Sequence, residues 1–383
     1  MIAGWLAAAA YVVVLALVVR RVRVRRPALA DRPPVPSGPL LSVIVPARDE
    51  AVNIASCLQS ILATAYDPCE VIVVDDRSGD DTAALVREAA ATAAARGRVR
   101  LVTGSDTPPG WFGKQWALVQ GYRAARGDLL LFTDADTRHG PELTGRAVAT
   151  LTAERADLVT VLPRQEMGSF WERLLQPHVF FVLGSRVGDL RRMNRTRTPW
   201  NAIANGQFIL TTRAAYEAVG THGRVRDVVV EDLALAQTYV ADGKDVFAAH
   251  GQDFMATRMY RSFGEIVAGW TKNLALGAPR MLPPSPLLRR VFPWVMWSPA
   301  LAWIAPPVAW ALTGWPFAAV ATLASLTLWA VVYRGEGAPT RYALLYPVAA
   351  VIVAGIVIRS AIRGRRVTWK GREYETVGVG RGR

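Results

Sequence analysis

Cysteine and histidine are scarce in this sequence of 383 residues, which contains two cysteines and four histidines. The two thiols, Cys57 and Cys69, are too few for the disulfide framework of a small secreted domain, and we interpret them as core residues. The four histidines do not follow the spacing of a metal-binding motif. The sequence therefore excludes a disulfide scaffold and a zinc finger.

Acidic residues are also in deficit, with 31 Asp and Glu against 45 Lys and Arg, so the formal net charge is +14. A basic excess is typical of proteins that bind nucleic acid or an anionic membrane surface. The sequence shows no helix-turn-helix and no aromatic platform for bases, so we expect no nucleic-acid partner. The clearest basic clusters instead flank long apolar runs, which favours a membrane; they comprise Arg20, Arg21, Arg23, Arg25 and Arg26, then Arg359, Arg363, Arg365, Arg366 and Lys370.

The apolar residues concentrate near the two ends of the sequence. Residues 2–19 form an uninterrupted apolar run, which is long enough for a membrane-spanning helix. Five arginines follow this run and no positive charge precedes it within the chain, so it predicts an uncleaved anchor that leaves the next segment in the cytoplasm. Four prolines interrupt 291–314, which favours a re-entrant or interfacial segment and a cytoplasmic tail. We expect an anchor over 1–20, a basic Pro-rich linker over 21–39, a globular domain over 40–275, a membrane region of two or three hydrophobic segments over 276–360, and a basic tail over 361–383.

The central region alternates between apolar β-rich runs and helical patterns. This alternation predicts an α/β domain with a doubly wound, mostly parallel sheet. Residues 168–193 fit either a core helix or a helix at the membrane interface. Residues 226–240 read as a strand that ends in a Glu-Asp pair and is followed by a helix. The other expected strands are 40–47, 69–76, 99–103, 128–136 and 206–212, and the expected helices are 50–63, 81–96, 114–126 and 213–219.

Three acidic sites lie at the ends of expected strands, where parallel sheets bind ligands. The segment VIVVDDRSGDDT at 71–82 can bind a nucleoside, or its acids can cap a helix. Asp134 and Asp136 can hold a divalent cation together with a diphosphate, although a D-x-D triplet often arises by chance. Glu231 and Asp232 can supply a general base, or they can be favourable charges at a helix N-terminus.

The order and spacing of these motifs resemble those of family-2 nucleotide-sugar glycosyltransferases. The matching segments are PARDEAVNI at 46–54, VVDDRSGDDT at 73–82, GKQWALVQGY at 113–122, TDAD at 133–136 and VEDLAL at 230–235. The resemblance implies a GT-A catalytic domain over 40–275 with a Rossmann-like, mostly parallel sheet. It also implies a cytoplasmic position for this domain, between N- and C-terminal transmembrane helices.

The resemblance also implies a role for individual residues. Asp134 and Asp136 would hold a divalent metal, Mg²⁺ or Mn²⁺, with Asp136 as the direct ligand. Asp232 would be the catalytic base that deprotonates an acceptor hydroxyl, with Glu231 as its neighbour. The nucleotide sugar would contact Pro46, Ala47, Glu50, Asp75, Asp76, Gly113, Lys114 and Asp134.

One departure from the family concerns polymer synthesis. Processive polysaccharide synthases of this family carry Gln-x-x-Arg-Trp, whereas this chain has RMYRSFGEIVAGWTKN at 258–273. The resemblance still allows Arg258 and Lys272 to bind phosphate and Trp270 to form the floor of the acceptor site. The alternative is an amphipathic helix with Trp270 as an interface anchor. Gly206 fits either an acceptor-side strand or a tight packing turn.

The flanking apolar segments resemble those of membrane-bound members that glycosylate isoprenoid lipids, such as bacterial carotenoid and hopanoid-associated glycosyltransferases. The resemblance implies inverting, metal-assisted transfer of one sugar from a nucleotide-diphosphate sugar to an isoprenoid-type lipid at the cell membrane. Two alternatives remain open. One is a processive polysaccharide synthase, and the other is a non-catalytic membrane scaffold that retains the fold.

Overall fold

The structure of the protein is a computed structural model that describes residues 1–22, 27–92, 95, 97–187, 189–363, 366–369 and 372–375. The expected basic positions Arg23, Arg25, Arg26, Arg365 and Lys370 lie outside these residues, as does most of the expected tail.

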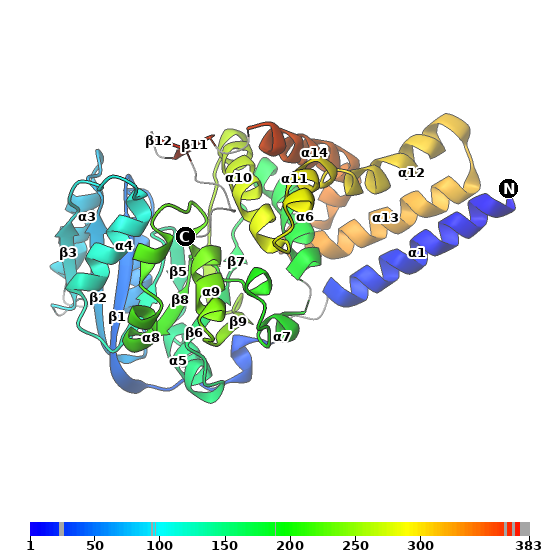
Figure 1. Cartoon of the computed structure of the whole chain (residues 1–383). Helices are drawn as coiled ribbons and strands as arrows, with labels where there is room; N and C mark the ends of the chain where they lie inside the picture. Colours follow the sequence, from blue (N-terminus) through cyan, green and yellow to red (C-terminus); the bar gives the residue numbers. More distant parts are fainter. Residues whose placement is uncertain are drawn as a thin grey trace.

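A seven-stranded sheet forms the centre of the globular domain, with the strand order β3-β2-β1-β4-β8-β6-β9 (Figure 1). Strand β8 runs antiparallel to both of its neighbours, and all other neighbouring strands are parallel. This arrangement confirms the expected mostly parallel sheet. The strands are β1 (Ser37–Ala47), β2 (Asp67–Asp75), β3 (Val99–Thr103), β4 (Leu129–Phe132), β6 (Leu158–Leu162), β8 (Ile209–Thr212) and β9 (Val246–His250).

Helices cover both faces of this sheet because neighbouring strand residues point to opposite sides. Val43 and Val45 pack into one buried cluster, while Ile44 packs into the other. The first face is covered by α2 (Ile54–Leu62), α3 (Thr82–Ala90) and α5 (Leu143–Ala153), and the second by α4 (Gly113–Ala124), α8 (Arg213–Ala218) and α9 (Glu231–Ala241).

A second, three-stranded sheet adjoins the end of β4 and was not anticipated. It has the order β5-β10-β7, formed by β5 (Thr137–His139), β7 (Arg164–Gln165) and β10 (Met255–Thr257). Because β4 ends at Phe132 rather than at 136, Asp134 and Asp136 lie in the turn between β4 and β5.

The expected strand over 226–230 is wrong. These residues form a turn, because α4 and the residue before it bind their backbone and keep it from pairing with the sheet. The Phe112 N–H donates to the Arg226 carbonyl at 2.9 Å, and the Gln115 amide donates to the Val228 carbonyl. The expected helix after the Glu-Asp pair is confirmed, and the pair opens α9.

A group of helices packs against one side of the globular domain and extends away from it (Figure 1). By length and composition, three segments could cross a membrane: Ile2–Arg20, Pro316–Gly335 and Thr340–Arg363. The proline-rich segment forms two helices, and α12 pairs with α13 although Pro306 and Pro307 lie inside it. The group comprises α1 (Ile2–Val22), α6 (Phe170–Val187), α10 (Phe263–Gly277), α11 (Pro286–Val295), α12 (Pro299–Thr313), α13 (Pro316–Gly335), the 3₁₀-helix η5 (Thr340–Leu345) and α14 (Tyr346–Arg363).

Helix α6 occupies the core of this group, which answers the question that residues 168–193 left open. Leu174 and Leu175 are fully buried in the cluster that also contains Trp329 of α13. The first turn differs, because Phe170 and Trp171 are exposed and stack edge to face at 5.1 Å.

Candidate active site

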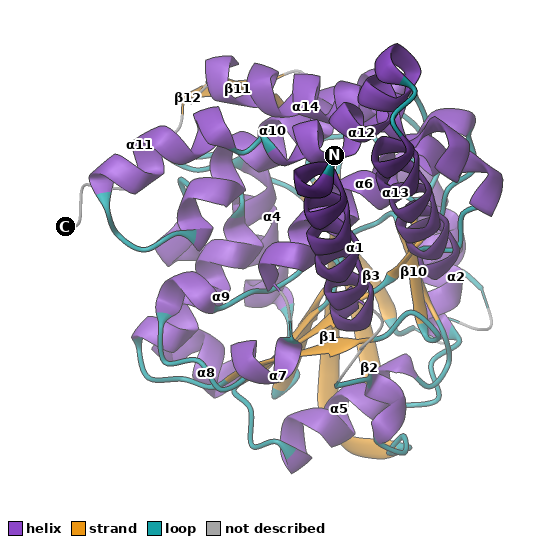
Figure 2. Cartoon of the chain, turned by 90° about the vertical axis from the view of Figure 1, so that its right-hand side faces the viewer, coloured by secondary structure: helices purple, strands orange, loops and turns teal. Residues whose placement is uncertain are grey.

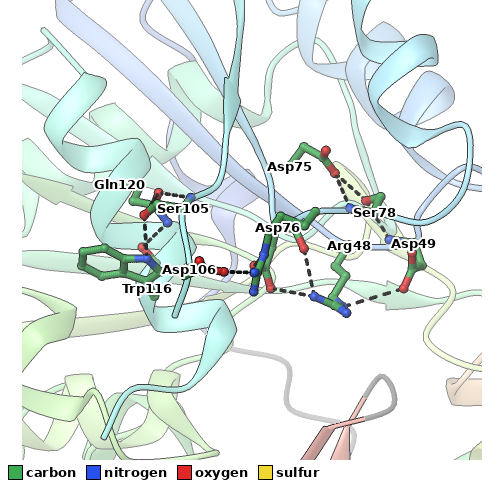
Figure 3. A network of polar contacts seen from close by, with 10 residues as sticks. Arg48, Asp49, Asp75, Asp76, Ser78, Ser105, Asp106, Trp116 and Gln120 are labelled. Carbon is green, nitrogen blue, oxygen red and sulfur yellow. Dashed lines mark hydrogen bonds and ion pairs between the residues drawn. The ribbon is translucent and has the colours of Figure 1, made fainter. Parts of the chain in front are cut away.

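The loops after β1 and β2 bind each other at the carboxyl edge of the sheet (Figure 3). The Asp76 N–H donates to the Ala47 carbonyl at 2.8 Å, and Arg48 Nη1 donates to the Asp76 carbonyl at 2.9 Å. The Glu50 N–H donates to Thr82 Oγ1 at 2.8 Å. The two loops therefore form one rigid edge, which carries the residues expected to bind the nucleotide.

The two neighbouring aspartates of this edge have different partners. Asp75 accepts a hydrogen bond from the Ser78 N–H at 3.1 Å and so holds its own loop. Asp76 Oδ2 lies 3.4 Å from Arg48 Nη1, and the Asp76 side chain is buried. Pro46 belongs to β1 and pairs in register with Val74, so it fixes the strand end beside the loop.

Lys114 connects the Asp134–Asp136 motif with the Glu231–Asp232 motif. Its Nζ lies 2.8 Å from Asp134 Oδ1 and 2.7 Å from Glu231 Oε1. Burial lowers the pKa of Lys114, but the two carboxylates outweigh it and hold this pKa well above its ordinary value. Lys114 is therefore a permanent cation at the start of α4, next to the buried Gly113.

Asp136 is the aspartate of the triplet that Lys114 does not contact directly. Burial, with repulsion from Asp134 and Glu50, raises the pKa of Asp136 to about 7. Its Oδ1 atom is buried, and no described residue offers it a hydrogen bond. A buried carboxylate oxygen without a hydrogen-bond partner, in a turn that carries a second aspartate, fits one ligand of a divalent cation. Within the described ranges no group of three or more His, Cys, Asp or Glu side chains could hold a metal, so phosphate and water oxygens would have to complete such a site.

Asp232 is held by two backbone N–H groups at the start of α9. Its Oδ2 accepts from the Gly206 N–H at 2.8 Å, and its Oδ1 accepts from the Leu233 N–H at 2.7 Å. Burial, with the charge of Glu231, nevertheless raises the pKa of Asp232 to about 6. A Cβ atom at Gly206 would lie 3.3 Å from both Asp232 Oδ2 and Lys114 Nζ, so glycine permits this close approach.

Helix α10 and the segment before it contribute the remaining expected residues. Arg258 forms a double hydrogen bond with Glu172 of α6, at 2.9 and 3.0 Å. Trp270 is only 4% exposed and packs between Phe180 and Tyr260, with ring centroids at 5.5 and 6.0 Å.

Lys272, two residues after Trp270, lies in the field of the acidic site. Burial lowers the pKa of Lys272, and Lys114 lowers it further, whereas Glu231, Asp134 and Asp232 raise it. The charges of these acids therefore act on Lys272, while Arg258 and Trp270 contact α6.

Sequence reasoning missed three residues that organise the site. Arg48 supports Asp76, and Glu172 is a fully buried acid that fixes Arg258. Arg261 donates to Asn53 Oδ1 at 2.8 Å and so joins the start of α10 to the β1–α2 loop. Glu172 could have been suspected, because a lone acid on an apolar helix usually has a basic partner. No local pattern points to Arg48 or Arg261.

Comparisons with known proteins agree with this geometry. Residues 42–220 match the model of the family described as Glycosyl transferase family 2. A curated relative, 4,4'-diaponeurosporenoate glycosyltransferase from Staphylococcus aureus (strain USA300), is 33% identical over 245 residues, which are 62% of this chain and 61% of the relative. The protein of the same name from strain MRSA252 is 32% identical over the same shares. The chain thus matches about three fifths of the length of these relatives.

A solved structure shares the fold over nearly the whole chain. It is the mannosyltransferase PcManGT from Pyrobaculum calidifontis, described in complex with GDP-Man and Mn²⁺. It aligns with a TM-score of 0.58 and 22% identity, covering 94% of this chain and 96% of that protein. The family match, the relatives and the shared architecture lead to one conclusion: residues 42–220 of this chain form a glycosyl transferase family 2 domain with the GT-A fold.

Proposed function

We propose that this protein transfers a single sugar from a nucleotide-diphosphate sugar to an isoprenoid-type membrane lipid, with inversion and with the help of a divalent metal. The main observation in support of this proposal is that Lys114 forms ion pairs with both Asp134 and Glu231. These ion pairs bring the two carboxylates together with the neighbouring Asp232. A site that joins a nucleotide-binding edge, an aspartate pair and a buried base contains the groups that glycosyl transfer needs.

The nucleotide would bind along the edge formed by the loops after β1 and β2. Asp76 is the carboxylate best placed to accept hydrogen bonds from the base or ribose, while Asp75 and Glu50 hold the loops that position it. The nucleotide sugar in the structure of PcManGT supports a donor of this class.

Asp134 and Asp136 would hold the metal, with Asp136 Oδ1 as the oxygen that lacks any other partner among the described residues. A bound Mg²⁺ or Mn²⁺ supplies charge neutralisation at the leaving diphosphate. Lys114 and Lys272 add positive charge on the same side, because both lie in the field of Asp134.

Asp232 would accept the proton of the acceptor hydroxyl. The acceptor oxygen then bonds to the anomeric carbon while the bond from that carbon to the diphosphate oxygen breaks, which inverts the centre in one displacement. A nucleotide diphosphate leaves without a proton, so a single carboxylate suffices, unlike the two that glycoside hydrolysis requires. The N–H groups of Gly206 and Leu233 fix the orientation of this base.

A membrane lipid as acceptor is supported by the apolar helices beside the site. Helix α1 exposes Leu6, Val13 and Leu17, which suits contact with lipid. An anchored enzyme can reach a lipid without moving it into water, where each exposed methylene costs about 0.8 kcal/mol. The name of the Staphylococcus aureus relative supports a carotenoid acceptor. We place the protein in the cell membrane with several spans and the catalytic domain in the cytoplasm.

The test combines the purified full chain, radiolabelled nucleotide sugars, Mg²⁺ or Mn²⁺ and an isoprenoid lipid extract. We expect label in the organic phase at one sugar per lipid, and at least about a hundredfold less with Asp232→Asn. A water-soluble labelled polymer would instead indicate a polysaccharide synthase. Absence of nucleotide-diphosphate binding in calorimetry would indicate a non-catalytic scaffold.

A further inference from the structure

Helix α14 differs in direction from the other long apolar helices. Together with η5 it provides 24 residues of mean hydropathy 2.1, which is enough to cross a bilayer. Figures 1 and 2 show α1, α12 and α13 running away from the sheet domain, whereas α14 lies across their base beside α10. Length and composition alone therefore do not decide whether α14 crosses the membrane.

Contacts between α1, α12 and α13 show that these three helices share a far end. The rings of Trp5 and Phe317, near the starts of α1 and α13, lie 6.3 Å apart. Further along α1, the Tyr11 hydroxyl donates to the Ala302 carbonyl of α12 at 2.8 Å and lies 2.7 Å from Ser325 Oγ of α13. Helices α1 and α13 are thus parallel and pack directly against each other, and α12 runs antiparallel to both on the other side of α13 (Figure 1).

Most of α14 lies towards the opposite end of this bundle, and its first residue, Tyr346, lies near Ser325 of α13 (Figure 1). It packs against α10 most extensively, and then against α12, α6 and α11. The start of α10 is joined to the globular domain, because Arg261 before it binds Asn53. A span beside α13 would carry the second half of α14 towards Trp5 and Phe317. Helix α14 instead packs mainly against α10, and Ile356 and Val357 of its second half are buried in the cluster that holds Trp270 of α10 together with residues of α13.

The other face of α14 is apolar and exposed along its length. It carries Val348, Val351, Ile358 and Ile362, at helical spacing, with the exposed Arg359 among them. An apolar helix face with a basic residue is typical of a helix that lies at a bilayer surface. An arginine there attracts anionic head groups.

We propose, on the basis of the membrane anchoring argued above, that α14 lies in the bilayer surface on the side of the catalytic domain and does not cross. The face formed by Val348, Val351 and Ile358 contacts the acyl boundary, Arg359 contacts lipid phosphates, and Ile362 at the end of the helix lies at the level of the hydrated head groups. The chain then crosses the membrane with α1 and α13 and passes back beside α13 through α12, which at 15 residues is shorter than the candidate spans. Residues 366–369 and 372–375 remain on the side of the catalytic domain. This position also brings the lipid surface next to α10, which carries Lys272, so a lipid head group reaches the site directly.

The first test measures which side of a sealed vesicle each end of α14 faces. The native Cys57 and Cys69 are buried, and burial raises the pKa of both thiols to about 12, so neither reacts readily with a maleimide. Cysteine is introduced singly in the full chain at Leu344 or Ile362, both 70% exposed. These positions lie 18 residues apart, about 27 Å along a helix. The reference variants are Ala84→Cys on α3 and Thr313→Cys at the far end of α12, both at exposed positions.

We expect an impermeant maleimide to label L344C and I362C from the same side as A84C, and T313C from the other side. Labelling of I362C together with T313C would overturn the proposal. If A84C and T313C react from the same side, the anchoring itself is wrong, and this result is distinct from the first.

The second test measures depth and does not depend on reagent access. Spin labels at Val348, Val351 and Ile358 are compared with labels at Val320 and Leu323, which are exposed positions of α13. We expect similar depths for the three α14 labels and a gradient of depth along α13. A depth gradient along α14 of the kind expected for α13 would contradict the proposal.

Discussion

The four carboxylates of the site divide into two pairs according to their distance from one lysine. Asp134 and Glu231 each form an ion pair with Lys114, whereas Asp136 and Asp232 have raised pKa values and no ion pair among the described residues. Carboxylates with raised pKa values in a buried site are typical of reacting or metal-binding groups. The division therefore supports Asp232 as the base and Asp136 as the metal ligand.

Asp232→Asn tests the base. The variant keeps a side chain of the same size, so it should bind the donor nucleotide about as well as the parent protein. Without a base, sugar transfer should fall at least about a hundredfold. Donor affinity is measured by calorimetry and transfer by counting product. Loss of donor binding would show that Asp232 has a binding or folding role instead.

Glu231→Gln is the matched control, since it removes the neighbouring charge and the ion pair with Lys114 but leaves Asp232 in place. It should reduce transfer less than Asp232→Asn. If Glu231→Gln is the inactive variant and Asp232→Asn is active, the base is Glu231.

The rate of transfer should depend on pH through Asp232. Burial and the charge of Glu231 raise the pKa of this carboxyl to about 6. Only the deprotonated form can accept a proton, so kcat should increase as the pH rises through about 6 and then level off. The measurement is kcat between pH 5 and 8 at saturating donor and acceptor. An unchanged acid limb in the residual activity of Asp232→Asn would assign the titration to another group.

Asp136→Asn tests the metal ligand. The substitution is isosteric and lies in a turn after β4, so the fold should persist. It removes a carboxylate oxygen, and we expect most of the turnover to be lost and Mn²⁺ binding to weaken. Mn²⁺ binding is followed by electron paramagnetic resonance, and folding by the thermal midpoint. Wild-type turnover of this variant at limiting metal would refute the metal role.

Among the connections between elements, the ion pair of Glu172 and Arg258 stands out because it joins α6 to the segment that leads into α10. Glu172 is fully buried, and the two residues form a double hydrogen bond. The pair therefore sets the position of the helix that brings Lys272 to the site.

Arg258→Met should destabilise the protein by roughly 3 kcal/mol, because it leaves the Glu172 carboxylate buried without its cation. Glu172→Gln should cost less, since Arg258 is partly exposed and can reach water. The free energy of unfolding in detergent is compared for the two single variants and for the double variant. Equal costs for the two single variants would show that the burial of Glu172 is not the dominant factor.

Taken as one body, the protein consists of a sheet domain and a group of apolar helices that packs against one side of it (Figures 1 and 2). Under the proposed function, the nucleotide sugar would bind on the side of the sheet domain and the acceptor would approach from α6, α10 and α14. We therefore expect an acceptor that is apolar along most of its length.

Acceptor length should therefore control KM. For a series of isoprenoid alcohols in mixed micelles, KM should fall as units are added, because each buried methylene contributes about 0.8 kcal/mol at most. The KM for the donor should stay constant across the series. A KM for the acceptor that does not change with length would show that the apolar helices do not bind the lipid.

The sequence by itself determined the class of the domain. Alternating strands and helices require a mostly parallel sheet, and the acids at strand ends must then meet at one edge. The long apolar runs likewise identified α1 and the other long helices of the membrane region, because a run of apolar residues is a property of the local sequence and needs no contact with a distant segment.

Tertiary structure alone decided which acids pair with a cation and which remain unpaired. The Lys114 bridge joins residues that are 20 and 117 positions away in the chain, and the partner of Arg258 is 86 positions away. Residues 226–230 have a strand-like composition, but contacts from the start of α4 hold them as a turn. The direction of α14 likewise depends on its packing against α10. Such contacts follow from the meeting of distant segments, so no local periodicity or motif could specify them.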